Sequence, residues 1–306
     1  RVRIGAFKAH NFDELKKGVE RLPLSAYFPR NSRPVVRASC AKSALYHSDA
    51  VAERAGDAAA SRLGGAPGGQ QPTEASLYVR LYKDEASVSV DAAHSLFMRG
   101  YRTHIGDAPL RETLAAACIW ASGWGANLPL LDPFCGSGTI LVEGLLRQCR
   151  AVTTPDQRMS FQDWPSHSGA AFSEWFEHLP QSKPTGNAFG IEIDPEAAKA
   201  ADSNIERAGV TNHVRLRVGD ALDNILDAPK KAFIVSNPPY GKRLASDRHP
   251  SVILQRFVER LAKRDDWSGV FLLLPPELGS ALPGRWDTVA TFSNRGTPVR
   301  LFQRMG

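Results

Sequence analysis

Residues 131–139 read Leu131-Asp132-Pro133-Phe134-Cys135-Gly136-Ser137-Gly138-Thr139, and they join a short apolar strand to a helix. Glycines between a strand and a helix allow a tight turn and a close approach of a ligand. The N-terminus of the helix adds free N–H groups and a partial positive charge. Asp132, however, places a carboxylate in the turn, which disfavours a phosphate and suits a cationic amino group. The segment therefore predicts a ligand-binding turn at the edge of an α/β sheet.

Strands and helices alternate from Leu128 onward, which predicts a parallel, doubly wound sheet. The first five expected strands are Leu128 to Leu131, Ala188 to Ile193, Val214 to Val218, Ala232 to Val235 and Val270 to Leu274. A final pair, Val289 to Phe292 and Val299 to Gln303, is joined through Asn294-Arg295-Gly296. A long insert, residues 151–184, separates the first two strands, and we interpret its Trp164 and Trp175 as core anchors.

Acidic side chains follow the second and third of these strands. Glu192 ends the second strand, where a bidentate carboxylate can hold both hydroxyls of a ribose. Asp220 lies in Gly219-Asp220-Ala221 after the third strand and can accept a hydrogen bond from the amino group of an adenine. Together with the turn around Asp132, these residues predict one binding site across successive strand ends.

The fourth strand ends in Asn237-Pro238-Pro239-Tyr240. Proline disfavours the helical region for the residue before it, so Asn237 is held extended with its amide facing outward. A carboxamide, the Pro238 carbonyl and the Tyr240 ring can together hold a planar base and accept hydrogen bonds from an exocyclic amino group. The pattern therefore indicates an amine-binding turn.

The excess of positive charge lies in the first third of the chain. Residues 1–105 contain 16 Lys and Arg against 10 Asp and Glu, whereas the remainder has 22 of each kind. The elements expected in this part are a helix capped by Asn11 or Asp13, a strand over Pro34 to Ser39, a helix from Ser48 or Asp49 to Leu63, and a hairpin around Lys83-Asp84-Glu85. A small basic α+β module beside a neutral domain suits nucleic-acid binding, with Arg37, Lys42, Arg54, Arg80 and Lys83 as candidate contacts. A solvated surface that happens to be basic is the alternative.

Composition narrows the class of protein further. The chain has 306 residues, 42% of them hydrophobic and 23% charged, which is typical of a globular protein of two domains. No apolar run reaches the roughly 20 residues that a membrane span needs. The four cysteines lack metal-site spacing, so we expect reduced thiols, no bound metal and a cytoplasmic location. The chain begins at Arg1 without a methionine or a signal sequence, and we expect a fragment.

These strand-end motifs resemble the S-adenosylmethionine-dependent methyltransferases. More specifically, the chain resembles the THUMP-containing N2-guanine RNA methyltransferases, closest to those that modify bacterial large-subunit (23S) rRNA. This resemblance is carried by residues 45–51, 99–102 (Arg-Gly-Tyr-Arg), 108–112 (Ala-Pro-Leu-Arg-Glu), 132–139 and 237–244. The resemblance implies a Rossmann-like seven-stranded S-adenosylmethionine methyltransferase domain over residues 96–306. It also implies a THUMP RNA-binding domain over 32–95 and the rear part of a ferredoxin-like domain over 1–31. Lys242 departs from the family, which more often has an acid there.

The resemblance also assigns roles to individual residues. Those implied to contact S-adenosylmethionine are Asp132, Phe134, Gly136, Gly138, Thr139, Glu192, Asp220, Ala221 and Asn237. Those implied to be catalytic are Asn237, Pro238, Pro239 and Tyr240. A guanine amino nitrogen is a poor nucleophile, so Asn237 and the Pro238 carbonyl would orient it by accepting its hydrogens, while Tyr240 stacks on the base.

Other readings stay open on the sequence alone. The same asparagine turn serves DNA adenine-N6 methyltransferases, and a tRNA guanine-N2 methyltransferase would carry an identical catalytic turn. An inactive RNA-binding or assembly factor belongs to a different class, and the intact acids at the strand ends argue against it. Cys135 could be a nucleophile for cytosine methylation, but its place inside the turn favours a packing role.

Overall fold

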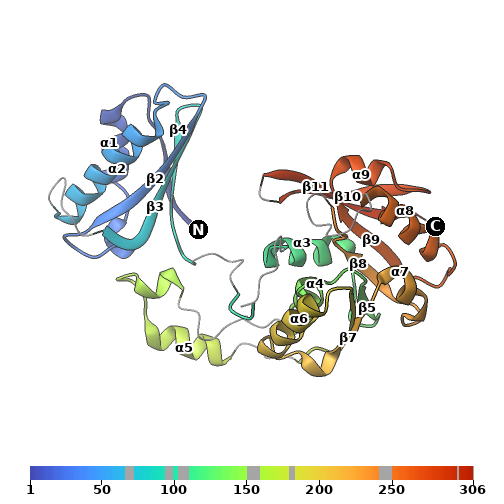
Figure 1. Cartoon of the computed structure of the whole chain (residues 1–306). Helices are drawn as coiled ribbons and strands as arrows, with labels where there is room; N and C mark the ends of the chain where they lie inside the picture. Colours follow the sequence, from blue (N-terminus) through green and yellow to red (C-terminus); the bar gives the residue numbers. More distant parts are fainter. Residues whose placement is uncertain are drawn as a thin grey trace. The chain divides into compact units, whose positions relative to one another are not determined.

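A computed structural model describes residues 1–65, 72–93, 99–102, 110–149, 159–178, 183–240, 250–294 and 296–305. The chain divides into two compact units (Figure 1). Unit 1 contains Arg1–Leu96 and Asp156–Leu179, and unit 2 contains Phe97–Pro155 and Pro180–Gly306. No helix in the described ranges is long and apolar enough to cross a membrane.

Unit 1 is a four-stranded sheet with two helices on one face (Figure 1). The strands, in spatial order β1-β4-β3-β2, are β1 (Val2–Lys8), β4 (Glu85–Val90), β3 (Pro72–Tyr82) and β2 (Arg33–Ala41). The two helices are α1 (Phe12–Glu20) and α2 (Ser48–Leu63). The expected β3–β4 hairpin is confirmed, with Tyr82 paired to Glu85. Asn11 caps α1 as expected, because its side chain accepts a hydrogen bond from the Glu14 backbone N–H.

The boundary expected at residue 31 does not divide the structure. Strand β1, which the sequence did not predict, pairs antiparallel with β4 and so belongs to the same sheet as β2. A bulge between Arg3 and Gly5 interrupts the alternation of apolar and polar residues in β1, and this removes the period-2 signal of a strand. Residues 1–31 and 32–95 therefore share one core, which contains Leu15 of α1 and Val79 of β3.

The insert packs with unit 1, although the sequence placed it within the domain 96–306. The Phe161 backbone N–H donates to the Ala92 carbonyl at 3.0 Å. The Trp164 ring meets the Tyr27 ring edge-on at 4.8 Å, which confirms Trp164 as a core anchor. Trp175 on α5 (Gly169–Glu177) is 56% exposed, so its predicted role as an anchor is wrong. Its contact is the Phe172 ring on the same helix, 5.8 Å away.

Unit 2 contains a seven-stranded sheet with helices on both faces (Figure 1). The strands, in spatial order, are β10 (Trp286–Asn294), β11 (Thr297–Arg304), β9 (Gly269–Leu274), β8 (Phe233–Ser236), β5 (Leu130–Asp132), β6 (Ala188–Glu192) and β7 (Val214–Val218). The five strands from β9 to β7 are parallel, and the β10–β11 pair joins them antiparallel. The predicted sheet is thus confirmed, as a mixed sheet with an antiparallel pair at one edge.

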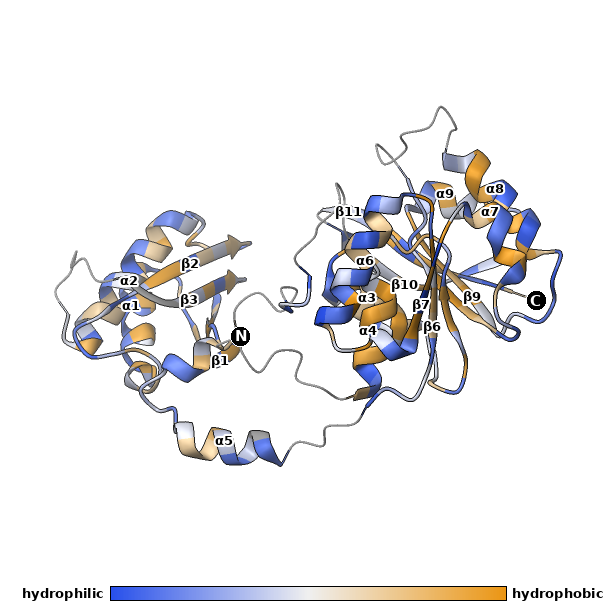
Figure 2. Ribbon diagram, turned by 60° about the horizontal axis from the view of Figure 1, so that its bottom comes forward, coloured by the Kyte–Doolittle hydropathy of each residue, from blue (hydrophilic) through white to orange (hydrophobic). Residues whose placement is uncertain are grey.

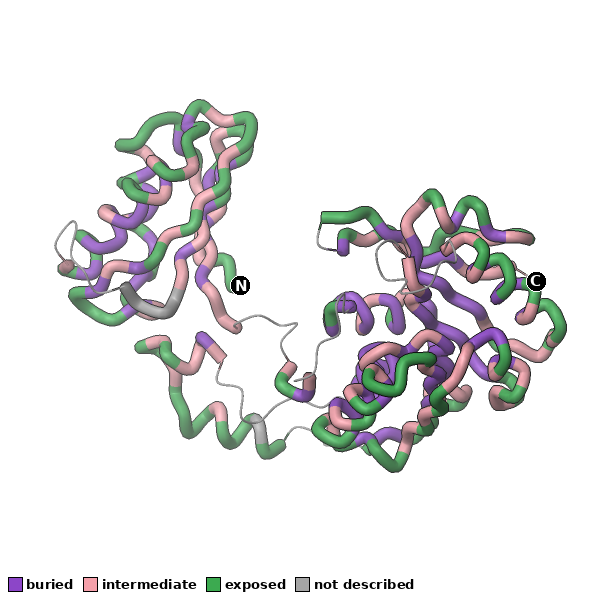
Figure 3. Tube along the Cα trace, in the orientation of Figure 1, coloured by how far each residue is buried: buried purple, intermediate pink, exposed green. Residues whose placement is uncertain are grey.

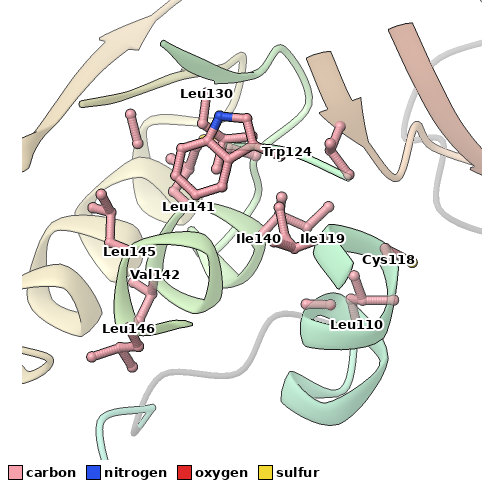
Figure 4. Close-up of a cluster of buried hydrophobic side chains, with 14 of the residues drawn as sticks. Leu110, Cys118, Ile119, Trp124, Leu130, Ile140, Leu141, Val142, Leu145 and Leu146 are labelled. Carbon is pink, nitrogen blue, oxygen red and sulfur yellow. The ribbon is translucent and has the colours of Figure 1, made fainter. Parts of the chain in front are cut away.

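Two hydrophobic cores lie on opposite faces of this sheet, because consecutive strand residues point to opposite sides. One core, with Leu130, packs against α3 (Glu112–Ser122), α4 (Thr139–Cys149) and α6 (Pro195–Arg207), and Figure 4 shows Trp124 and Leu141 within it. The other, with Leu131, packs against α7 (Ala221–Asn224) and α8 (Pro250–Leu261). The short helix α9 (Pro276–Ser280) contacts β11. The central strands β5, β8 and β9 are accordingly hydrophobic and almost entirely buried (Figures 2 and 3).

The expected start of the helix before the sheet falls partly outside the described residues. The sequence favours a helix here with Pro109 in its first turn and an apolar stripe of Leu110, Leu114, Ala117 and Cys118. Pro109 is not among the described residues, and α3 begins at Glu112. Its N-cap is Arg111, in an extended conformation. The apolar residues predicted for this helix, Leu114 and Cys118, are buried as expected.

We predict that Gly190→Ala destabilises unit 2. A Cβ at this position of β6 would lie 2.5 Å from Leu216, 2.8 Å from Leu141 and 2.9 Å from the Cys135 sulfur. Overpacking of this kind costs about 1–3 kcal/mol. Urea unfolding should show this loss. The control, Gly125→Ala, should be close to neutral because the added methyl meets only the end of the exposed Asn127 side chain; equal loss in both variants would contradict the packing argument.

Candidate active site

Four adjacent strands of unit 2 end at the same edge of the sheet and carry the polar residues that the sequence selected. The strands are β8, β5, β6 and β7 in spatial order, all parallel. The chain runs outward from β5 to β6 and β7 and then returns to β8 on the other side of β5. Open α/β sheets bind ligands at such a reversal of strand order. Asn237 and Asp132 therefore flank the switch point, with Glu192 and Asp220 on successive strands beyond it.

Asp132 is a buried carboxylate at the end of β5, with 1% of its surface exposed. Its Oδ1 accepts hydrogen bonds from the Ser236 hydroxyl at 2.5 Å and from the Phe134 backbone N–H at 3.1 Å. Burial raises the pKa of Asp132 to about 7, although both hydrogen bonds act to lower it. The carboxylate is thus held in a setting that favours a cationic partner.

The glycine turn leaves open space beside its backbone. Gly136 and Gly138 have φ values of 52° and 77°, which favour glycine. A Cβ on Gly136 would meet no atom within 4 Å, whereas one on Gly138 would lie 3.3 Å from Ala201 of α6. Gly138 therefore allows close packing of the turn on α6, and Gly136 leaves room for a ligand. Thr139, the first residue of α4, is buried.

Two side chains hold the turn in place, and the sequence assigned this task to neither of them. Asn204 of α6 is fully buried and donates from Nδ2 to the Ser137 carbonyl at 3.0 Å. The Glu192 carboxylate accepts from the Gly136 N–H at 2.8 Å and from the Asp194 N–H at 3.0 Å. Glu192, predicted as a ribose ligand, thus also positions the turn, and each carboxylate oxygen keeps a further lone pair.

The remaining predicted cofactor residues have structural partners of their own. Asp220 caps α7, because its Oδ1 accepts from the Leu222 N–H at 2.9 Å. Ala221 is buried at the start of that helix. Phe134 packs edge-on against Phe257, with ring centroids 5.0 Å apart. These contacts hold the loops in place and leave the second carboxylate oxygen of Asp220 available.

Asn237 carries an amide oxygen that is buried and has no hydrogen-bond partner within the described ranges. Pro238 is buried, and Pro239 and Tyr240 are half-buried. The Tyr240 hydroxyl accepts from Asn294 Nδ2 at 3.4 Å, a contact that links the proline turn to the β10–β11 hairpin. Residues 241–249 lie outside the description, including Lys242, where the family resemblance is weakest. Since buried polar atoms are rarely left without partners, the Asn237 oxygen is suited to accept from a ligand.

A buried ionic network anchors the segment before α3. Glu143 of α4 is 2% exposed, accepts from the Tyr101 hydroxyl at 2.9 Å and lies 3.2 Å from Arg99. Burial raises the pKa of Glu143 to about 7, and Arg99 acts to lower it. Arg102 pairs with Glu112 at 3.2 Å. The sequence pointed to the Arg-Gly-Tyr-Arg motif but not to its partner Glu143, which lies far along the chain.

The five candidate nucleic-acid contacts do not form one surface. Arg37 of β2 and Arg80 of β3 are exposed on the face of the unit 1 sheet opposite the helices. Lys42 and Lys83 lie in turns with φ of 52° at each residue. Arg54 lies on α2, where its guanidinium stands over the Phe12 ring of α1.

Cys135 is fully enclosed by the glycine turn and its supports, with 6% of its surface exposed. Burial raises the pKa of its thiol well above the ordinary value, and the neighbouring Asp132 acts in the same direction. A neutral thiol is a weak nucleophile, so the structure supports the packing role.

We predict that Asp132→Asn stabilises the protein at high pH. A carboxyl whose pKa is about 7 when folded and 3.8 otherwise contributes its stability below pH 4, and that stability is lost as the pH rises to 7. Asparagine can keep both accepted hydrogen bonds without the charge. Thermal unfolding should show the variant more stable than wild type at pH 8, by up to about 4 kcal/mol. The difference should shrink at pH 5; a pH-independent difference would contradict the buried-charge argument.

Comparisons with known proteins agree with this arrangement. A family model described as an RMKL-like methyltransferase domain matches residues 99–278. The ribosomal RNA large subunit methyltransferase K/L of Ectopseudomonas mendocina is 30% identical over 319 residues, covering 97% of this chain and 44% of that protein. Its counterpart in Shewanella frigidimarina is 39% identical over 202 residues, covering 63% of this chain and 28% of that protein. The chain thus spans less than half the length of these curated relatives.

Solved structures resemble the chain over nearly its whole length. The methyltransferase SMU.472, complexed with SAH, has a TM-score of 0.82 and 26% identity, covering 99% of this chain and 83% of that one. A possible methylase from Clostridium difficile has a TM-score of 0.84 and 25% identity, covering 99% and 82%. On the strength of the match to residues 99–278, the chain belongs to the RMKL-like methyltransferase domain family.

Proposed function

We propose that this chain is an S-adenosylmethionine-dependent methyltransferase that acts on the N2 amino group of a guanine in large-subunit rRNA. The observation that carries the proposal is the buried Asn237 oxygen, which lacks a partner in the described structure and flanks the switch point beside Asp132. An exocyclic amino group has the hydrogens that this oxygen requires.

The residues around the switch point fit the cofactor. The buried Asp132 carboxylate suits the cationic amino group of its methionine part, and the space beside Gly136 admits a close approach. Glu192 and Asp220 each keep acceptor capacity, for the ribose hydroxyls and the adenine amino group respectively. S-adenosylmethionine supplies an electrophilic methyl group on a sulfonium centre. This chain's residues hold and orient it.

Methyl transfer on this site needs orientation more than acid–base power. The Asn237 amide oxygen and the Pro238 carbonyl would accept the two amino hydrogens of the base, which directs the nitrogen lone pair toward the methyl group. Tyr240 is half-buried and tethered through its hydroxyl to Asn294, so its ring is fixed for stacking on a base. A base in a helix has to leave its stack to reach such a pocket.

RNA is favoured as the substrate by the surplus of positive charge in residues 1–105 and by the name of the relatives, ribosomal RNA large subunit methyltransferase K/L. We assign residues 32–95 to a THUMP-like RNA-binding role, together with the β1–α1 segment that completes the sheet. The experiment that tests the whole proposal is incubation of the chain with labelled S-adenosylmethionine and, in separate reactions, rRNA, tRNA and DNA, followed by nucleoside analysis. N2-methylguanosine in rRNA is the expected product. Label in tRNA, on adenine of DNA, or nowhere would contradict it.

We predict that Asn237→Ala abolishes methyl transfer and leaves cofactor affinity within about threefold of wild type. The amide accepts from the substrate amine, so its loss removes an interaction of the transition state. Initial rates at saturating RNA and calorimetric titration with S-adenosylmethionine separate the two effects. A variant that keeps its full rate would refute the role assigned to Asn237.

We predict that Ser236→Ala weakens cofactor binding most at low pH. The Ser236 hydroxyl lowers the pKa of Asp132, so without it less of the carboxyl is ionised at neutral pH. The ratio of variant to wild-type Kd for S-adenosylmethionine should therefore fall as the pH rises from 6 to 8.5. Ionisation of S-adenosylmethionine itself changes both Kd values by the same factor, so it cancels in this ratio. A ratio that is constant over this range would mean that Ser236 acts through packing alone.

A further inference from the structure

The sheet of unit 1 has one covered face and one open face. Side chains of β3 alternate, with Leu77, Val79 and Leu81 fully or almost fully buried under the helices. Their neighbours Tyr78, Arg80 and Tyr82 point to the other side and are half-buried or exposed. The same alternation places Arg37 and Ser39 of β2 on the open face.

The registers of β2, β3 and β4 arrange the open face in rows. Cross-strand partners in a sheet lie on the same face. The first two rows are Arg37–Tyr78–Ser89 and Ser39–Arg80–Ser87. Small serines therefore flank Arg80 on both sides and Tyr78 on one side, while Arg37 lies directly beside Tyr78.

The next row adds a second aromatic ring and an acid. Tyr82 pairs with Glu85 and is 40% exposed. Glu85 in turn pairs with Lys8 of β1, which offsets its charge. The two tyrosines are four residues apart on β3 and lie on the same face, since the side-chain period of a strand is two.

Cationic groups already stand over both rings. The Arg1 guanidinium lies 3.4 Å from the centre of the Tyr78 ring, and the Arg80 guanidinium lies 5.8 Å from that of Tyr82. The Arg1 guanidinium is itself a flat group lying against Tyr78, so a group of similar shape can stack there once the arginine moves aside. A nucleobase is a flat group of this kind, and arginines beside it can pair with phosphates.

We propose that this open face of β2, β3 and β4 binds an unpaired segment of RNA by stacking bases on Tyr78 and Tyr82 while Arg37 and Arg80 hold the backbone. This inference rests on the proposed function, of which it defines the substrate-binding surface. The occupant is single-stranded because only unstacked bases can present their faces to a ring, and stacking is worth about 1–3 kcal/mol per base. The positive charge of the face complements the phosphates.

The helix side of unit 1 provides a matched control. Arg54 of α2 is also exposed and also stands near an aromatic ring, at 5.9 Å from Phe12, but it lies on the opposite side of the sheet. Arg54→Ala therefore removes one positive charge from the same unit without touching the open face. A loss of affinity that follows charge alone would be equal at Arg54 and at Arg80.

The test measures binding of the chain to a labelled single-stranded RNA of 12 mixed nucleotides, and to a duplex of the same length, by fluorescence anisotropy. The double variant Tyr78→Ala/Tyr82→Ala should bind the single strand at least tenfold more weakly, and the double Tyr→Phe variant should bind as wild type does. Arg37→Ala and Arg80→Ala should each reduce the slope of log affinity against log salt concentration by about 0.7, and the Tyr→Ala changes should leave this slope unchanged. Far-UV circular dichroism and thermal unfolding check that every variant is folded.

Three results would overturn the proposal: unchanged affinity in the double Tyr→Ala variant, an equal loss in Arg54→Ala and Arg80→Ala, or wild-type binding of the duplex as tight as that of the single strand. The first would mean that the RNA does not stack on these two rings. Methyl transfer is measured separately. A wild-type chain that binds the single strand through the tyrosines but transfers no methyl group would refute the proposed function and leave the binding face supported.

Discussion

The hydrogen bond from the Ser236 hydroxyl to the Asp132 carboxylate, 2.5 Å long, joins the two strands that flank the switch point. Asn237 follows Ser236 directly, so this one contact sets how far the amide of the proline turn lies from the acid of the glycine turn. The same contact keeps an anion where burial alone would neutralise it, because the hydroxyl lowers a pKa that desolvation raises. Geometry and ionisation at the site therefore depend on the same pair of atoms.

The surrounding structure shows how a buried acid is tolerated. Four buried polar side chains, Asp132, Thr139, Asn204 and Ser236, belong to the glycine turn or to the elements that hold it. Beneath them the strands are apolar on both faces, which gives a rigid floor and excludes water. The free-energy cost of burying these polar groups is thus confined to positions where they also shape the site. The Gly136 backbone illustrates this: its N–H is used by Glu192, while the space above its Cα stays open.

Local patterns in the sequence were enough to predict most of unit 2. Strand ends followed by acids, glycines or prolines are short-range signals, and parallel strands bring such ends to one edge, so Asp132, Glu192, Asp220 and Asn237 could be placed together before the structure was seen. Contacts between distant segments could not be predicted in this way. Examples are the pairing of Tyr101 with Glu143, the tether of Tyr240 to Asn294 and the packing of Trp164 on Tyr27. Bulged β1 was missed because its alternation is broken.

The two units can be expected to contribute to different kinetic constants. Contacts made far from the reacting atoms hold substrate and transition state equally, so they lower KM and leave the chemical step unchanged. The surplus of positive charge in residues 1–105 and the open face of the unit 1 sheet can supply only this kind of binding. Asn237 differs, because the hydrogen bond that its oxygen accepts becomes strongest as the amine nitrogen rehybridises to attack the methyl group. Selection of one amine requires acceptors at fixed positions rather than a general attraction for phosphate.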